Sequence, residues 1–253
     1  MKIEIIPCLQ DNYSYLIIDE NNKNACVIDP SEAKPIIDYL NKHHIQLNYI
    51  LNTHHHYDHV GGNKELKNKY NAKIIGYVGD TKRIPFIDIA LEDQSIWIEN
   101  DFEARVIHVP GHTLGHICFY FYKHENLFTG DTLFSLGCGK IFEGTYEQMF
   151  SSINKIKKLP PNTKIYCGHE YTKKNSDFCI SLDSKNNKLI SKIKEINSKI
   201  SNKLPTIPST LKDETECNIF LRCEDISIKS SLNMNNSEPR EIFAKLRDLK
   251  DNF

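Results

Sequence analysis

Apolar residues recur along the first 170 residues of the chain in short runs that polar turns separate. Runs of this length, rich in β-branched and aromatic residues, predict strands over residues 3–6, 13–18, 25–28, 48–51, 73–77, 104–109, 117–122, 127–129 and 164–167. Helical spacing predicts a helix that Ser31 caps and that ends near Lys42, and a second over residues 145–158. Strands interleaved with helices predict a mixed α/β layered fold.

The pattern changes after about residue 171. Residues 184–203 are rich in Lys, Asn and Ile, with an apolar residue every three or four positions, and predict an amphipathic helix. Residues 238–250, which Ser237 opens, predict a second helix with one apolar face. We therefore expect a domain of residues 1–172, followed by a small, mainly helical region of residues 173–253.

The composition is that of an ordinary globular chain. Its 253 residues are 40% hydrophobic and 26% charged, and 32 basic residues nearly balance 33 acidic ones. The formal net charge of −1 gives no overall field that would attract nucleic acid or an anionic membrane, so we expect neither as a partner. A chain of this length can bury a sizeable core. We expect a monomer.

The compartment is indicated by the cysteines and by the first residues. The opening segment, Met1 to Pro7, lacks the apolar run of a secretory signal. The sequence also lacks a stretch near the roughly 18 apolar residues of a membrane helix. Eight cysteines are scattered without a CxxC pair, which favours reduced thiols over a disulfide framework. These features predict a cytoplasmic protein.

One segment concentrates residues that bind metals. His54, His56, Asp58 and His59 form an HxHxDH pattern directly after an apolar strand. Imidazole and carboxylate are the usual ligands of zinc, and also of iron or manganese. Residues two apart in an extended loop share a face, so His54 and His56 can bind one ion together, while His55 points away and is not counted as a ligand. The alternative is a histidine-rich surface tract, but the strand–loop–helix context and the interleaved aspartate disfavour it.

Three later residues repeat one local arrangement. His112, Asp131 and His169 each follow an apolar run and a glycine. Any one alone would more often be a loop histidine or a turn aspartate. Three such positions after a complete HxHxDH pattern reverse that preference and predict further ligands.

The order HxHxDH, GH, GD, GH resembles the metallo-β-lactamase superfamily. The resemblance implies an α/β (α+β) architecture, an αββα sandwich with the metal site at one edge of its two sheets. It assigns His54, His56 and His112 to one ion, assigns Asp58, His59 and His169 to another, and makes Asp131 the bridge between both. Asp29 matches a strand-end aspartate that supports the ligand loop, with a plain turn residue as the alternative. His116 falls outside the ligand pattern, and we expect it to be packed or hydrogen-bonded.

Further segments resemble the glyoxalase II family within this superfamily. They are GCGKIFEGT at residues 137–145, HEYT at 169–172 with Asn175 and Phe178 beyond, PSTL at 208–211, NIFLR at 218–222 and RDLKDNF at 247–253. Together with the ligand pattern they span the whole chain in the family's order. Two departures are visible. Phe142 stands where some members have tyrosine, which removes a hydroxyl contact, and Ile219 replaces a proline, which affects loop rigidity more than chemistry.

The resemblance implies a substrate of the S-(2-hydroxyacyl)glutathione class. Glutathione carries two carboxylates, so Lys140, Arg247 and Lys250 are expected to anchor its glycyl end. Phe142 and Tyr171 complete the expected substrate-binding set. The alternative for the two terminal cations is a solvated helix end, where positive charge is also favoured.

The activity implied is hydrolysis of the thioester, typically of S-D-lactoylglutathione to D-lactate and glutathione, which removes methylglyoxal. A hydroxide bridging two divalent metal ions would attack the carbonyl, and Asp58 would orient that hydroxide as the catalytic residue. We expect zinc in both positions, with iron or manganese left open by the same ligand set. The thiolate leaves readily, so the reaction does not demand a general acid.

Two other functions compete with this one. The nearest is a glutathione-persulfide dioxygenase of the same superfamily, an oxidoreductase with one iron. The complete second ligand set and the RxxKDxF ending disfavour it. The other is a non-catalytic metal-loaded scaffold or glutathione-binding module, which the complete ligand set disfavours. A thioesterase assay beside oxygen uptake with a persulfide separates the three.

Overall fold

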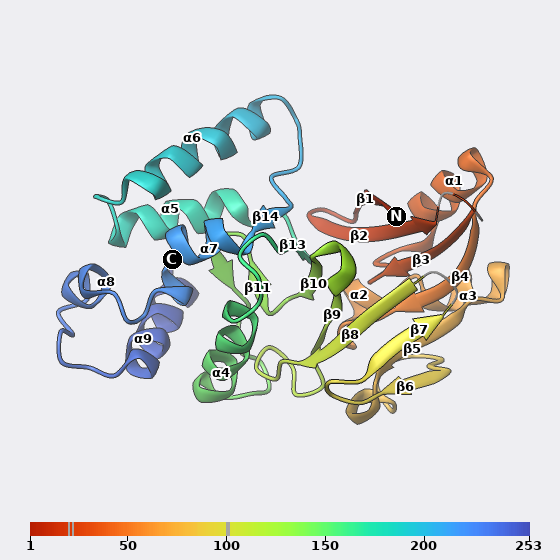
Figure 1. Cartoon of the computed structure of the whole chain (residues 1–253), viewed down its shortest axis with the longest axis horizontal. Coiled ribbons are helices and arrows are strands. Elements are labelled where there is room, and N and C mark those ends of the chain that lie inside the picture. Colours follow the sequence, from red (N-terminus) through yellow and green to blue (C-terminus); the bar gives the residue numbers. More distant parts are fainter. Residues whose placement is uncertain (20, 22, 100–101) are drawn as a thin grey trace. The chain divides into compact units, whose positions relative to one another are not determined.

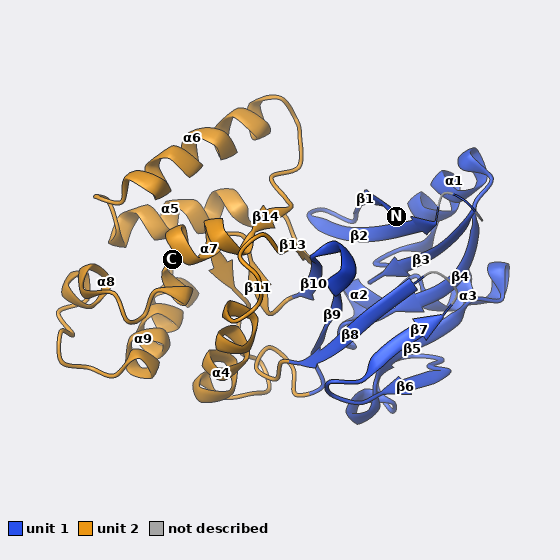
Figure 2. Cartoon of the chain, in the orientation of Figure 1, with its two compact units in different colours: residues 1–108, 115–130 blue, residues 109–114, 131–253 orange. Residues whose placement is uncertain are grey.

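The chain packs as two units, which Figure 2 shows in different colours. Unit 1 contains residues 1–108 and 115–130, and unit 2 contains residues 109–114 and 131–253. The computed structural model describes residues 1–19, 21, 23–99 and 102–253. The domain boundary expected after residue 172 stays a prediction.

Unit 1 begins with a sheet whose strands follow one another in chain order (Figure 1). These strands are β1 (Lys2–Cys8), β2 (Asn12–Asp19), β3 (Asn24–Ile28), β4 (Gln46–Leu51), β5 (Lys73–Tyr77) and β6 (Ile89–Leu91). The first three pair antiparallel, and β3 to β6 pair parallel. Parallel neighbours need crossover connections. Helical segments in these crossovers are α1 (Ala33–His43), α2 (Tyr57–Val60), α3 (Asn63–Tyr70) and the 3-10 turn η1 (Val78–Asp80).

A second layer of unit 1 packs against this sheet. It consists of the antiparallel strands β7 (Ile96–Glu99), β8 (Phe102–His108), β9 (Ile117–Phe121) and β10 (Asn126–Gly130), with the 3-10 turn η2 (Tyr122–His124) between the last two. Aromatic rings join the layers. The ring of Tyr15 lies 5.3 Å from that of Phe128, and the ring of Tyr49 lies 5.3 Å from that of Trp97. Every described residue of β2 is buried, because the strand is covered on both faces.

Unit 2 combines short strands with most of the chain's helices. Its elements are β11 (Leu133–Phe134), β12 (Gly137–Cys138), α4 (Tyr146–Lys157), β13 (Lys164–Cys167), α5 (Thr172–Leu182), α6 (Asn187–Ser201), β14 (Ser209–Thr210), α7 (Leu211–Cys217), η3 (Ile219–Leu221), α8 (Ile226–Ser231) and α9 (Pro239–Asp251). Rings of Phe178, Phe220 and Phe243 pack in its core, with centroids 6.2 Å and 5.7 Å apart along the series. Burial of such side chains holds the helices together.

The predicted strands and helices are present, but several ends and short elements differ. Ser31 is not the N-cap of α1, because the helix begins at Ala33 and Glu32 takes the cap position, while the Ser31 backbone N–H donates to the Ser14 hydroxyl. Helix α9 follows Glu238 rather than Ser237, because the Glu238 and Glu241 side chains form a reciprocal cap. The sequence did not predict β6, β7, β11, β12, β14, α2, α5, α7 and α8, which are short or lack a clear apolar period.

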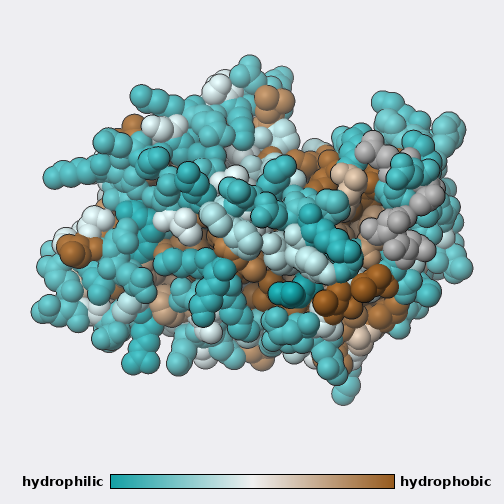
Figure 3. All heavy atoms as spheres, viewed as in Figure 1, coloured by the Kyte–Doolittle hydropathy of each residue, from teal (hydrophilic) through white to brown (hydrophobic). Residues whose placement is uncertain are grey.

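The surface and the helices give one further finding. In the part of the chain that the structure describes, helices fall short of the length and apolar character that a membrane span requires. The face drawn in Figure 3 is largely hydrophilic, with apolar residues gathered in smaller areas.

Candidate metal centre

The HxHxDH residues of unit 1 gather on the loop between β4 and α3. His54 follows β4 and is fully buried, His56 occupies the N-cap of α2, and His59 lies buried within α2. The ring of His54 lies 4.7 Å from the His56 ring and 4.2 Å from the His59 ring. The short helix α2 turns the chain back on itself, so residues that alternate in sequence face the same point.

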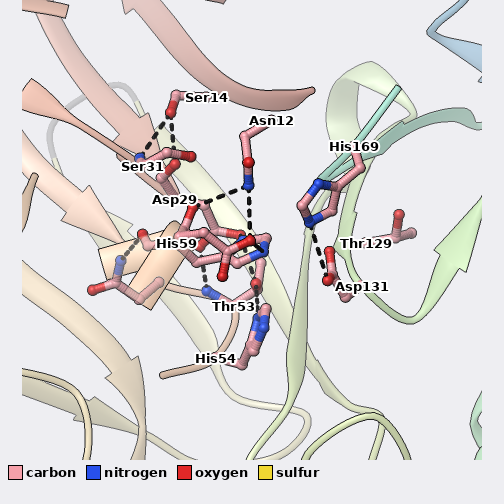
Figure 4. Close-up of polar contacts among 12 residues, drawn as sticks. Asn12, Ser14, Asp29, Ser31, Thr53, His54, His59, Thr129, Asp131 and His169 are labelled. Atoms are coloured by element: carbon pink, nitrogen blue, oxygen red, sulfur yellow. Dashed lines mark hydrogen bonds and ion pairs between the residues drawn. The ribbon is translucent and has the colours of Figure 1, made fainter. Parts of the chain in front are cut away.

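Asp29 fixes this loop from the end of β3. Its Oδ1 accepts the backbone N–H of Thr53 at 2.7 Å, and its Oδ2 accepts the Thr53 hydroxyl at 2.6 Å and the Nδ1–H of His59 at 3.0 Å (Figure 4). The Asp29 backbone has a φ of +46°, a left-handed conformation that Asp and Asn tolerate better than most residues. Asp29 is therefore bonded to the ligand loop, as the expected supporting role requires, and is not a plain turn residue.

These hydrogen bonds favour one tautomer in each of two candidate ligands. The single proton of the Thr53 hydroxyl goes to Asp29, so the His54 Nδ1, 3.0 Å from that oxygen, carries the proton of their bond. The His59 Nδ1 likewise carries the proton that it gives to a carboxylate. Each ring is left with its lone pair on Nε2, the state that a metal ligand needs. Ligand-type atoms of Asp29, His54 and His59 lie within 4.8 Å of one another.

Asp58 is held by a residue that the sequence reading did not single out. The Asn12 amide donates to the Asp58 carboxylate Oδ2 at 3.0 Å and to its backbone oxygen at 3.2 Å. Asn12 is buried, whereas the Asp58 side chain is 38% exposed. The same Oδ2 lies 3.6 Å from the His59 Nε2. Asn12 therefore fixes the position of the Asp58 carboxylate.

Unit 2 carries the three later ligand candidates, all buried. The Asp131 Oδ2 lies 3.5 Å from the His112 Nε2 and 3.3 Å from the His169 Nε2, the second of which Figure 4 shows. The His112 Nδ1 donates to the Lys140 carbonyl at 2.7 Å. Since a carbonyl can only accept, that nitrogen is protonated and the lone pair of His112 is on Nε2.

The spacing within each ligand set suits a divalent ion. Ligand atoms about 2.0–2.1 Å from a tetrahedral ion lie about 3.3–3.4 Å from one another. The separations of 3.3, 3.5 and 3.6 Å between carboxylate oxygens and Nε2 atoms are close to that edge length. Together with protonated Nδ1 atoms, this spacing and the chemistry of the donors fit a divalent metal.

Two expected substrate-binding aromatic residues lie against ligands of unit 2. The Tyr171 ring stacks on the His169 ring at 4.7 Å, and Phe142 meets the His112 ring edge-on at 5.1 Å. The exposed Lys140 places its Nζ 5.8 Å from the Phe142 ring centroid. Phe142 is 61% exposed and Tyr171 is 37% exposed, so both present surface to a ligand.

The two terminal cations sit differently from each other. Arg247 is 5% exposed, and its guanidinium donates to the Cys138 carbonyl and to Asp251. Lys250 is partly buried, lies 5.2 Å from the Phe178 ring centroid, and donates to the Lys174 carbonyl. Burial, together with the charges of Lys174 and Arg247, lowers the pKa of Lys250 to about 8. Neither residue is the freely solvated helix end that was the alternative.

Two other histidines have structural partners. The His55 Nδ1 lies 3.0 Å from the Asp80 carboxylate, outside the ligand pattern. His116 is buried and stacks on the His54 ring at 4.6 Å, as expected for a packed residue. Gly130 lies beside them with a φ of +46°, and a Cβ there would come within 2.4 Å of the Thr53 hydroxyl oxygen. The partners Asn12, Thr53 and Asp80 escape sequence reasoning because polar residues near turns carry no distinctive spacing.

Comparisons with known proteins show the family of the chain. The metallo-beta-lactamase superfamily model matches residues 10–169, and the model described as hydroxyacylglutathione hydrolase C-terminus matches residues 170–253. A hydroxyacylglutathione hydrolase of Pelagibacter ubique is 65% identical over 253 residues, which is 100% of both chains. One of Rhodospirillum rubrum is 42% identical over 100% of this chain and 99% of its own.

The fold is also found among solved structures. The BLEG-1 B3 metallo-beta-lactamase crystal structure superposes with a TM-score of 0.67 at 22% identity, covering 87% of this chain and 99% of that one. The metallo-β-lactamase fold and the His/Asp clusters support a divalent-metal site. The chain belongs to the hydroxyacylglutathione hydrolase family of the metallo-β-lactamase superfamily.

Proposed function

We propose that this chain hydrolyses S-(2-hydroxyacyl)glutathione thioesters, with S-D-lactoylglutathione as the typical substrate and D-lactate and glutathione as products. The observation that carries the proposal is the ligand chemistry. The Nδ1 atoms of His54, His59 and His112 are each bonded as donors, which in the neutral ring leaves the lone pair on Nε2, and these rings sit beside carboxylates in a family whose curated relatives bear the hydrolase name.

The proposed centre holds two divalent ions. His54, His56 and His112 would bind one ion, Asp58, His59 and His169 would bind the other, and Asp131 would join both. Zinc is the first expectation, and the same nitrogen and oxygen donors also accept iron or manganese. The support is the resemblance of the seven residues to the family pattern and the ligand-like spacing inside each unit.

The residues around the ions would orient the attacking water. When bound, the ions would provide Lewis acidity for the carbonyl and a water whose pKa is near neutrality. Asp58, which Asn12 holds on its Oδ2 side, would accept a hydrogen bond from that water and aim it at the thioester. The leaving glutathione thiolate has a pKa near that of a free thiol, about 8.5, so a dedicated acid is unnecessary.

The proposed substrate-binding set is Lys140, Phe142, Tyr171, Arg247 and Lys250. Lys140 and Lys250 carry the charge that would attract the glycyl carboxylate. Phe142 and Tyr171 pack on ligand rings and would line the path between that carboxylate and the thioester. Direct contact of Arg247 with substrate is implied by the family resemblance.

The compartment and the assembly state complete the proposal. All eight cysteines are free and buried, which supports a reducing environment such as the cytoplasm, and we propose a monomer there.

The test is turnover by the purified, metal-loaded protein. We expect S-D-lactoylglutathione to release a free thiol without oxygen uptake. Oxygen uptake with glutathione persulfide and no thioester cleavage would establish the dioxygenase instead. Tight metal binding with neither reaction would establish a non-catalytic module.

A further inference from the structure

A short segment of unit 2 lies between the C-terminal helices and two of the proposed metal ligands. It comprises residues 133–140, from β11 through β12 to Lys140, and all of it except Lys140 is buried. We call it the 133–140 segment. Side chains that come from distant parts of the sequence hold its backbone.

Five side chains donate to or accept from this backbone. The bonds join Asn175 to the Ser135 carbonyl at 3.0 Å, Glu214 to the Leu136 N–H at 2.8 Å, Cys179 to the Leu136 carbonyl at 3.2 Å, Asn218 to the Gly137 carbonyl at 3.1 Å and Arg247 to the Cys138 carbonyl at 2.7 Å. Hydrogen bonds from side chains on packed helices fix a loop more firmly than solvent can. The helical region therefore sets the conformation of this segment.

The other side of the segment contacts the ligands. The Lys140 carbonyl accepts the Nδ1–H of His112 at 2.7 Å. A Cβ on residue 139 would lie 1.8 Å from the Asp131 carbonyl oxygen and 3.4 Å from the His112 Nδ1, so only glycine fits there. Backbone displacement at residues 138–140 would thus reach His112 directly.

Arg247 is the cationic member of the five. Its Nε and Nη2 donate to Asp251 at 3.1 Å and 2.9 Å, and its guanidinium lies 5.4 Å from the Phe220 ring centroid. These two bonds to Asp251, which we call the Arg247–Asp251 fork, fix the guanidinium. Its Nη1 therefore points at the Cys138 carbonyl, two residues before Lys140. A bond from an ionised donor is stronger than a neutral one.

We propose that Arg247 is a positioning residue for the metal centre, beyond any contact with the substrate. By holding the Cys138 carbonyl it fixes the backbone from Cys138 to Lys140, and through the Lys140 carbonyl it fixes the imidazole of His112. The hydrogen bond from Arg247 to Cys138 also fixes the backbone from which the Lys140 side chain extends. Helix α9 is thereby coupled to metal binding. The proposal rests on the proposed function for the metal-binding role of His112 but not for the identity of the substrate.

The first test compares zinc affinity of Arg247→Ala with that of Arg222→Ala. Arg222 is a matched control, because it is also a mostly buried arginine of unit 2 that pairs with two carboxylates, Asp183 and Asp225. Loss of a direct partner of a metal ligand weakens binding by about 10–100-fold, and Arg247 acts one step further away. We expect zinc, measured by competition with a chromophoric chelator, to bind about tenfold more weakly to Arg247→Ala and unchanged to folded Arg222→Ala.

A second readout needs no metal. In apoprotein, the Nδ1 proton of His112 should be protected from solvent exchange and visible by NMR, and Arg247→Ala should speed its exchange. Arg247→Lys, which keeps one charged donor, should recover part of both effects. If Arg247→Ala does not fold, Asp251→Asn, which loosens the fork at an exposed residue, takes its place.

Unchanged zinc affinity and unchanged His112 exchange in folded Arg247→Ala would overturn the proposal. Equal weakening in Arg247→Ala and Arg222→Ala would also overturn it, because both changes would then act through general destabilisation. Failure of the proposed function is a separate result, since wild-type protein would fail to cleave the thioester while the zinc and exchange differences persisted.

Discussion

Replacing Asp29 by Asn isolates the support of the ligand loop. The carboxylate accepts three hydrogen bonds, from the Thr53 N–H, the Thr53 hydroxyl and the His59 Nδ1–H. An amide of the same size has one accepting oxygen, so at least one of these donors would face another N–H. Asn also tolerates the left-handed backbone at this position, where φ is +46°. The substitution therefore removes the negative charge and one hydrogen-bond acceptor, and it keeps the size of the side chain and the backbone conformation.

We expect zinc to bind about 10–100-fold more weakly to Asp29→Asn, because the partner that orients His59 is lost. That range corresponds to about 1.4–2.8 kcal/mol. The assay is chelator competition on the purified protein, with folding checked by circular dichroism. Asp88→Asn is a matched control, since Asp88 is another aspartate of unit 1 that accepts a backbone N–H, from Ile74 at 2.8 Å, and pairs with Lys67. Wild-type zinc affinity in Asp29→Asn would refute the supporting role.

Three further outcomes follow from the same account. Asp58→Asn should lower kcat by about 100-fold or more, the scale of losing one preorganised electrostatic contact, and near wild-type turnover with full metal content would contradict its role. Lys250→Ala should raise KM for the glutathione thioester by about tenfold and leave a small thioester unaffected, whereas Lys245→Ala, at an exposed position of the same helix, should change neither. Because the pKa of Lys250 is about 8, its positive charge is lost as pH rises through that value. The KM of wild type should then climb above pH 8 while that of Lys250→Arg should not.

The candidate ligands could be selected from the sequence because the segments that carry them follow strands, and their assignment to ions stays a prediction. A strand of buried apolar residues that ends in a polar turn brings its next side chains to the sheet edge, and this holds for His54 after β4 and Asp131 after β10. Patterns of this kind depend on neighbouring residues alone, so the folded structure keeps them. The family segments then assigned an order to the candidates.

The burial and the contacts of Arg247 could not be predicted from local sequence patterns. From the sequence, an arginine in the last turns of an amphipathic helix is either a solvated cation or a carboxylate binder. The structure buries it and bonds it to the Cys138 carbonyl, 109 residues away in the chain. A contact at that separation depends on how helices pack rather than on local spacing. Asn12 and Asp58, 46 residues apart, escape prediction for the same reason.

The misplaced helix cap at Ser31 has a related cause. A serine before a helical run is a good cap in isolation, but its backbone N–H is committed to Ser14 from the neighbouring strand. Tertiary hydrogen bonding outweighs a local preference of about 1 kcal/mol.

Metal titration of the apoprotein with thioester turnover as the readout tests the central claim most directly. Zinc would be added in known equivalents to chelator-treated protein, and hydrolysis of S-D-lactoylglutathione followed through the free thiol released. The account predicts that turnover reaches its plateau at two equivalents of zinc per chain, without consumption of oxygen. Full turnover at one equivalent, or no thioester cleavage at any metal content, would contradict it.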